Sequence, residues 1–293
     1  MPPTPRRRYR SADEDSARWD AVALRPGDVV VSSRSKHGTT WVQAVLLHLV
    51  HGPGPLPNRL PLLSPWVDHL VEPVERLAER LAAQGHRRVL KTHTPLDGVP
   101  LVPGVTYVVP ARHPLDAAVS LFHQGSNLRR AAPAREDGAA LPGPGRPPLG
   151  QWLARWVDDD PAPGEALDSL PGVALHLGDA WRRRHGPHDV ALVHHADLLV
   201  DLPGSVRRLA DRLGVETTDE QVGAVADVTS FTAMRGRADE LAPDVGVLRD
   251  RRAFFRGGRS GDGRAAASPD VLARYAARMR ALVPDDLRAW LHR

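Results

Sequence analysis

The sequence of 293 residues lacks cysteine, and its 39 lysine and arginine residues include only two lysines. Without cysteine the chain forms no disulfide, offers no thiolate nucleophile and has no cysteine-based zinc site. No apolar run approaches the roughly 20 residues of a membrane span, and the N-terminal residues lack the apolar core of a signal peptide. The sequence therefore predicts a cytoplasmic protein with no membrane partner.

The charge balance and the apolar content set the domain organisation. A formal net charge of +4 is too small for a surface that coats nucleic acid, so we expect no nucleic-acid partner. An apolar content of 42% is sufficient for one large core. We expect a disordered N-terminal arm over residues 1–20 and one domain over 21–293. A mobile loop is expected around 125–165, because residues 131–148 consist mainly of Ala, Pro, Gly and Arg.

Short β-branched runs alternate with segments of helical spacing. The expected strands are 28–33, 88–92, 105–109 and 189–194, and the expected helices include 41–50, 66–84, one that begins at Pro114, and about 270–292. Strands that alternate with helices favour parallel pairing and right-handed crossovers. The sequence therefore predicts an α/β fold, a three-layer α/β/α sandwich with a central parallel sheet.

The segment after the first expected strand, S-K-H-G-T-T-W at 35–41, is suited to binding an anion. A helix N-terminus at the end of a parallel strand offers free N–H groups and a positive dipole. Lys36 adds a charge, and Gly38 allows a close approach of the backbone. The order Lys-x-Gly differs from a Walker A loop, in which the lysine follows the second glycine. The residues alone leave open a simple turn whose threonines cap the helix.

The second expected strand ends in K-T-H-T-P at 91–95, which contains the only other lysine. Residues i and i+2 of a strand point to the same face, so Lys91 and His93 can converge on one atom. A compact ammonium group can follow a migrating proton or oxyanion better than a planar guanidinium. Two isolated lysines in an arginine-rich chain therefore indicate chemistry at these positions.

These segments resemble motifs of the cytosolic sulfotransferases. Residues 35–41 are similar to the family's P-K-S-G-T-T-W loop, with Ser35 and His37 as departures, and 91–95 is similar to its K-T-H-x-P motif. The resemblance implies a P-loop-like sulfotransferase fold that moves the sulfuryl group of 3'-phosphoadenosine 5'-phosphosulfate to an acceptor hydroxyl. It implies that His93 is the general base, that Lys36 and Lys91 assist as catalytic cations, and that transfer is in line. No metal is expected.

Further segments resemble the family's nucleotide-binding stretches. Residues 112–120 are similar to R-x-P-x-D-x-x-x-S, 229–234 to T-S-F-x-x-M, and 255–262 to F-x-R-K-G-x-x-G-D, with Gly257 in place of the lysine. His195 stands where the family has a tyrosine that contacts adenine. The donor-binding residues that the resemblance implies are Lys36, His37, Gly38, Thr39, Thr40, Trp41, Arg112, Ser120, His195, Thr229, Ser230, Phe231, Met234, Phe255, Arg256, Gly257 and Gly258.

Two other functions fit the same basic cleft. A P-loop-type nucleotide kinase is disfavoured by the order of Lys36 and Gly38, and a non-catalytic module that binds adenosine bisphosphate or RNA would not need Lys91 and His93. The acceptor is expected to be a small molecule with a hydroxyl group. A phenol, an aliphatic alcohol, a sugar and a natural-product scaffold all remain open, and so does the oligomeric state.

Overall fold

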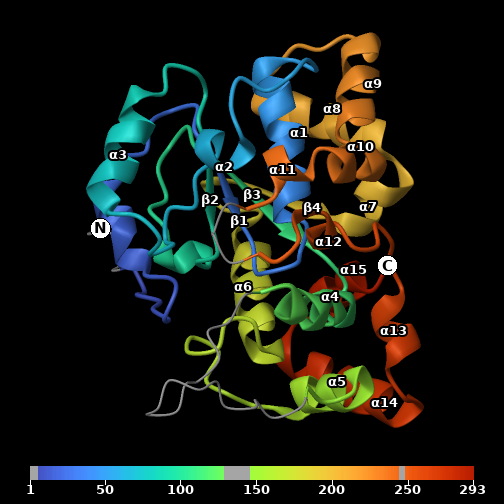
Figure 1. Ribbon diagram of the computed structural model, residues 1–293. Coiled ribbons are helices and arrows are strands. Elements are labelled where there is room, and N and C mark those ends of the chain that lie inside the picture. Colours follow the sequence, from blue (N-terminus) through green and yellow to red (C-terminus); the bar gives the residue numbers. More distant parts are fainter. Residues whose placement is uncertain (1–5, 129–145, 244–247) are drawn as a thin grey trace, which may run out of the picture.

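The computed structural model describes residues 6–128, 146–243 and 248–293, and Figure 1 shows its arrangement around a central sheet. The strands are β1 (Val29–Ser32), β2 (Val89–Thr92), β3 (Thr106–Ala111) and β4 (Asp189–His194). They lie in the order β2-β1-β3-β4, and every neighbouring pair is parallel. Val30 pairs with Leu90 on one side and with Tyr107 on the other. This confirms the predicted α/β fold with a parallel sheet.

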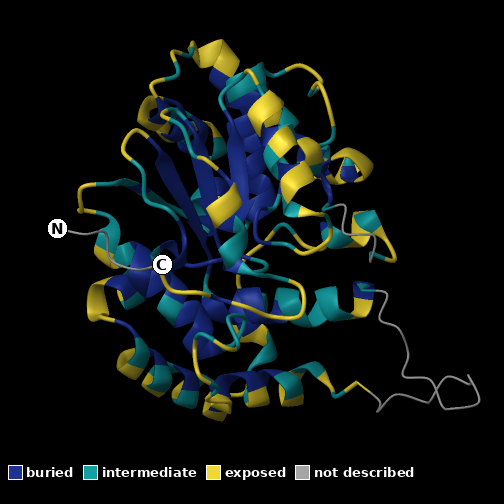
Figure 2. Ribbon diagram, turned by 90° about the vertical axis from the view of Figure 1, so that its left-hand side faces the viewer, coloured by how far each residue is buried: buried dark blue, intermediate teal, exposed yellow. Residues whose placement is uncertain are grey.

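The side chains of β1 alternate between two hydrophobic cores, which makes the sheet the middle of three layers. Val30 belongs to one core, whereas Val29 and Val31 belong to the other. Both faces of the strand are covered, and its four residues are all buried, as is typical of a parallel strand. Figure 2 shows the buried residues gathered along the strands and on the inner sides of the helices, while the exposed residues lie outside.

Each core is completed by its own set of helices (Figure 1). The core with Val30 contains residues of η1 (Ser16–Ala21), α3 (Val74–Ala83), η2 (Leu96–Gly98), α4 (Pro114–Asn127), α5 (Leu149–Asp158), α6 (Leu170–Arg183), α14 (Pro269–Leu282) and α15 (Asp285–Leu291), and Ala266 of α13 (Asp262–Ala266) packs against it. The core with Val29 contains residues of α1 (Thr39–His51), α2 (Leu60–Leu63), α7 (His195–Val200), α8 (Leu202–Leu213), α9 (Asp219–Val228), α10 (Phe231–Gly236) and α11 (Ala238–Leu241), and Phe254 of α12 (Arg251–Phe254) packs against it.

Two expected helices differ from those observed. The helix expected over 66–84 is wrong before residue 74, because the backbone there pairs with the sheet edge: the Lys91 amide donates to the Pro65 carbonyl, and the Val67 amide donates to the Lys91 carbonyl. The final helix, expected as one element, is two helices separated at Pro284, which lacks the amide that a continuous helix needs.

The N-terminal arm and the long loop also differ from expectation. Disorder over 1–20 does not hold for residues 6–20: only 3% of Tyr9 and 1% of Trp19 is exposed, and the Tyr9 hydroxyl donates to Asp97. Residues 1–5 and 129–145 lie outside the described residues, and α5 occupies part of the expected loop at 125–165. Within the described residues, no helix is both long and apolar enough to cross a membrane.

Candidate active site

A cavity of about 780 Å³ is lined by the residues that end or follow β1, β2 and β3, which are neighbours in the sheet. It brings together most of the residues predicted from the sequence: Lys36, Gly38, Thr39, Thr40, Trp41, Lys91, His93, Arg112, Ser120, His195, Phe231, Met234, Phe255, Arg256, Gly257 and Gly258. It does not bring in His37, Thr229 or Ser230. The His37 ring is buried and donates from Nδ1 to the Ser35 carbonyl, Thr229 donates to the Val225 carbonyl, and Ser230 caps α10.

The loop between β1 and α1 presents free backbone N–H groups at one wall of this cavity. The N-cap of α1 is Gly38, at φ 99°, and it provides no side-chain hydrogen bond to the first turn. Lys36 has φ 68°, a left-handed conformation that costs a lysine backbone strain. The unpaired amides and the dipole of a 13-residue helix therefore favour an anion here.

Both lysines of the chain line this cavity, and Lys91 is buried. Burial, together with the nearby charges of Arg112, Lys91 and Arg256, lowers the pKa of Lys36 to about 7. Burial likewise lowers the pKa of Lys91 to about 8. Among the described residues neither ammonium forms an ion pair with a carboxylate: Lys36 Nζ lies 4.0 Å from the Phe254 ring centroid and 3.4 Å from Gln124 Oε1. Two ammonium groups without a paired carboxylate, close to Arg112 and Arg256, fit an anionic ligand.

His93 presents a neutral imidazole in the same cavity. Its Nδ1 donates to the Ser33 carbonyl, so in the neutral ring Nε2 carries the lone pair. Burial holds its pKa well below the usual value, and the charges of Lys91 and Arg34 act in the same direction. The imidazole is therefore unprotonated at neutral pH and can take a proton at Nε2.

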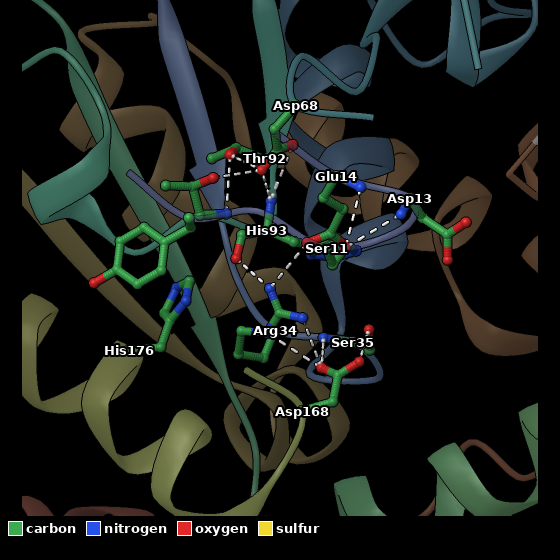
Figure 3. A network of polar contacts seen from close by, with 12 residues as sticks. Ser11, Asp13, Glu14, Arg34, Ser35, Asp68, Thr92, His93, Asp168 and His176 are labelled. Carbon is green, nitrogen blue, oxygen red and sulfur yellow. Dashed lines mark hydrogen bonds and ion pairs between the residues drawn. The ribbon is translucent and has the colours of Figure 1, made fainter. Parts of the chain in front are cut away.

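Two buried charged side chains hold the backbone of His93 (Figure 3). Asp68 accepts hydrogen bonds from the hydroxyl groups of Thr92 (2.7 Å) and Thr94 (2.6 Å) and from the His93 amide (3.1 Å). Arg34 donates to the His93 carbonyl, and its Nε donates to Asp168 Oδ1 at 3.1 Å.

The same network reaches the loop between β1 and α1, residues 33–38, which we call the anion loop. Asp168 accepts a hydrogen bond from the Ser35 hydroxyl at 2.8 Å, and Figure 3 shows the Arg34 guanidinium between Asp168 and His93. One arginine thus couples the position of His93 to the position of the loop that precedes α1.

Trp66 forms the wall beside His93. Lys91 Nζ lies 3.6 Å from its ring centroid, the His93 ring meets it edge to face at 4.4 Å, and the His69 ring stacks on it at 4.2 Å. The backbone pairing of the 65–67 segment with Lys91 sets this position. The cation–π contact holds the Lys91 side chain next to His93.

Asp116 fixes the end of the loop that follows α12 and the start of α13. Its two carboxylate oxygens accept from the Gly261 amide (2.9 Å) and the Gly263 amide (2.7 Å), and Arg112 donates to the Arg259 carbonyl at 2.7 Å. Gly258 has φ 58°, and a Cβ atom there would lie 2.4 Å from the Phe231 ring. Only glycine fits this close approach.

The His195 ring completes the cavity beside Trp41. The two ring centroids are 5.4 Å apart in an edge-to-face arrangement, and burial lowers the pKa of His195 to about 3. The pair therefore offers an uncharged aromatic surface near the anion loop. Across the described residues, no group of three or more His, Cys, Asp or Glu side chains is placed to hold a metal ion.

The sulfotransferase domain model matches residues 26–285, nearly the whole of this architecture. The chain belongs to the sulfotransferase family. It is 39% identical over 314 aligned residues to a glycolipid sulfotransferase of Mycobacterium bovis, which covers 99% of this chain and 95% of the relative. A glycolipid sulfotransferase of Mycobacterium tuberculosis is 38% identical, with the same two coverages.

Solved structures share the sulfotransferase fold. Retinol dehydratase in a complex with retinol and PAP superimposes with a TM-score of 0.68 at 22% identity, over 93% of this chain and 87% of that one. Mouse sulfotransferase SULT7A1 complexed with PAP gives 0.65 at 20% identity, over 95% and 93%. This sulfotransferase therefore has the predicted fold.

Several residues of the site could not be predicted from the sequence. Arg34, Asp68 and Asp168 act through partners distant in the sequence, 134 positions apart for Arg34 and Asp168. Glu14 lines the cavity from the segment expected to be disordered, and burial raises its pKa to about 7. Trp66 and Asp68 stand between Pro65 and Pro73, and only this proline-flanked position distinguishes them in the sequence.

Proposed function

We propose that this sulfotransferase transfers the sulfuryl group of 3'-phosphoadenosine 5'-phosphosulfate to a sugar hydroxyl of a glycolipid. The observation that carries the proposal is the shared cavity in which two lysines and two arginines lie with the neutral imidazole of His93. The donor is an anion at both ends, and the relatives at 38–39% identity are named glycolipid sulfotransferases.

The donor fits the two sides of the cavity. The amides of the α1 N-terminus and Lys36 bind the 5'-phosphosulfate, while Arg112, Ser120 and the loop at 255–259 bind the 3'-phosphate. Trp41 and His195 supply the aromatic surface for the adenine, since both rings line the cavity and both are uncharged.

Transfer proceeds by in-line displacement at sulfur. The acceptor oxygen forms a bond to sulfur as the bond between sulfur and the phosphate oxygen breaks, and the acceptor proton moves to Nε2 of His93. Lys36 neutralises the charge that develops on the departing bisphosphate, and Lys91 holds the sulfuryl oxygens. Catalysis then rests on positioning and charge, which is why Asp68 and Arg34 are built around His93.

The test is transfer of labelled sulfate from the donor to a mycobacterial glycolipid extract by the purified chain. We expect labelled glycolipid and an equal amount of adenosine 3',5'-bisphosphate. Tight binding of the bisphosphate without transfer to any hydroxyl acceptor would instead identify a non-catalytic nucleotide-binding protein.

A further inference from the structure

A second cavity, of about 220 Å³, adjoins the active-site cavity. It lies against α2 and the 64–72 segment, and it reaches Gln43 of α1. The two cavities share five lining residues, Trp66, His69, Val71, Lys91 and Pro243. The stacked rings of Trp66 and His69 are therefore a common wall, with His93 on the active-site side.

The second cavity has a mostly apolar lining: Leu60, Pro61, Leu62, Pro65, Val71 and Pro243. Polar side chains at its edge bind one another. Gln43 donates to the Ser64 hydroxyl at 2.7 Å, and Arg80 donates to Glu72 at 2.6 Å. Arg80 Nε has no hydrogen-bond partner among the described residues, and Lys91 Nζ lies over the Trp66 ring, so it is the apolar side chains of the lining that suit a hydrocarbon group.

The common wall, in contrast, has polar atoms that could bind a polar ligand group. Trp66 Nε1 and His69 Nδ1 are buried, and among the described residues neither has a hydrogen-bond partner. A buried donor without a partner is costly, so a ligand hydroxyl or ether oxygen at this wall removes a penalty. The wall thus suits the polar part of an acceptor, and the cavity behind it suits an apolar part.

Exposed apolar side chains surround the same region. Leu62 is 40% exposed, Leu70 45% and Val71 62%, and each lines one or both cavities. We call these three residues the apolar rim. The other large hydrophobic side chain that is exposed in the described chain is Val200, on α7. Apolar surface concentrated at a cavity mouth is typical of a site for an apolar ligand.

We propose that the second cavity and the apolar rim bind the hydrocarbon chain of the acceptor while its sugar hydroxyl lies at His93. The inference rests on the proposed function and adds the subsite for the lipid part. Its support is the wall shared with the active site, the division between polar and apolar surface, and the exposed rim. A cavity of about 150 Å³ holds benzene, so this one has room for roughly six to eight carbon atoms.

The test measures how strongly alkyl β-D-glucosides bind to the chain saturated with adenosine 3',5'-bisphosphate. Methyl, butyl, hexyl and octyl glucosides are titrated by calorimetry below their micellar concentrations. Burial of a methylene group strengthens binding by up to about fourfold. We expect affinity to rise two- to fourfold per methylene along this series. An affinity that does not change with chain length would overturn the inference.

Two matched variants locate the binding. Leu62→Glu places a charge on the rim at a residue that lines only the second cavity, and Val200→Glu makes the same change at the distant exposed position. We expect Leu62→Glu to lower the octyl-to-methyl affinity ratio at least tenfold and Val200→Glu to leave it unchanged. A ratio that Leu62→Glu leaves intact, or that both variants lower equally, would show that the chain binds elsewhere.

Sulfate transfer, assayed in the same samples, separates the two proposals. If sulfate is transferred to glycolipid but binding does not depend on chain length, the lipid subsite is refuted and the proposed function stands. Chain-length dependence without any transfer would remove the catalytic proposal instead.

Discussion

The lowered pKa of Lys36 predicts that donor-site affinity falls as the pH rises above 7. In the free protein burial and nearby cations bring this pKa to about 7. A bound phosphate raises it again, so the complex holds a proton that the free protein releases. The contribution of Lys36 to binding is therefore complete below pH 7 and is lost between pH 7 and the raised pKa. The phosphates themselves, with a second pKa of about 6, keep nearly constant charge in that range.

The magnitude follows from the protonated fraction of Lys36. That fraction falls from about one half at pH 7 to about one hundredth at pH 9, so affinity for adenosine 3',5'-bisphosphate should fall about 50-fold. Lys91, whose pKa is about 8, adds at most a further tenfold over the same range. Calorimetry at pH 7, 8 and 9 in buffers of different ionisation enthalpy measures both the affinity and the proton taken up.

Two substitutions separate the lysines. In Lys36→Met the affinity for adenosine 3',5'-bisphosphate should fall tenfold or less between pH 7 and 9. In Lys91→Met the affinity should still fall about 50-fold over this range. An affinity that is constant from pH 7 to 9 in the unsubstituted chain, with no proton taken up, would refute the argument that the cavity holds cations in need of an anion.

Two further predictions concern the stability of the sheet and the positioning of His93. Arg88 donates to the buried carboxylate of Asp28 at 2.8 Å, so Arg88→Leu should lower the free energy of unfolding in guanidinium by about 3–5 kcal/mol; a loss under about 1 kcal/mol would contradict this. Asp68→Asn weakens the hold on the His93 backbone, so kcat should fall roughly tenfold to a hundredfold while the Kd for the bisphosphate stays within about threefold. An equal loss of both would mean that Asp68 acts on folding.

The sequence was sufficient to predict the positions of the four strands and of the loops that follow them. All four strands lie where β-branched runs predicted them, because a parallel strand is covered on both faces and reads as a short apolar run. Lys91 and His93 could be placed together because both end one strand, and the neighbouring strand ends explain why Lys36 and Arg112 reach the same cavity.

Other parts of the site depend on contacts that no local pattern contains. The 65–67 segment has helical spacing, yet its backbone pairs with Lys91 and thereby places Trp66 beside His93. Arg34 reads as one of many arginines until its partners are known. Residues 6–20 have the composition of an arm, but two buried aromatic side chains hold them against the domain and bring Glu14 to the cavity.

The catalytic claim is tested most directly by comparing transfer and binding in His93→Ala. The account predicts that labelled sulfate transfer from 3'-phosphoadenosine 5'-phosphosulfate to a glycolipid acceptor is lost, while the Kd for adenosine 3',5'-bisphosphate changes less than about threefold, because His93 acts on the acceptor proton. Turnover close to that of the unsubstituted chain would contradict His93 as the base.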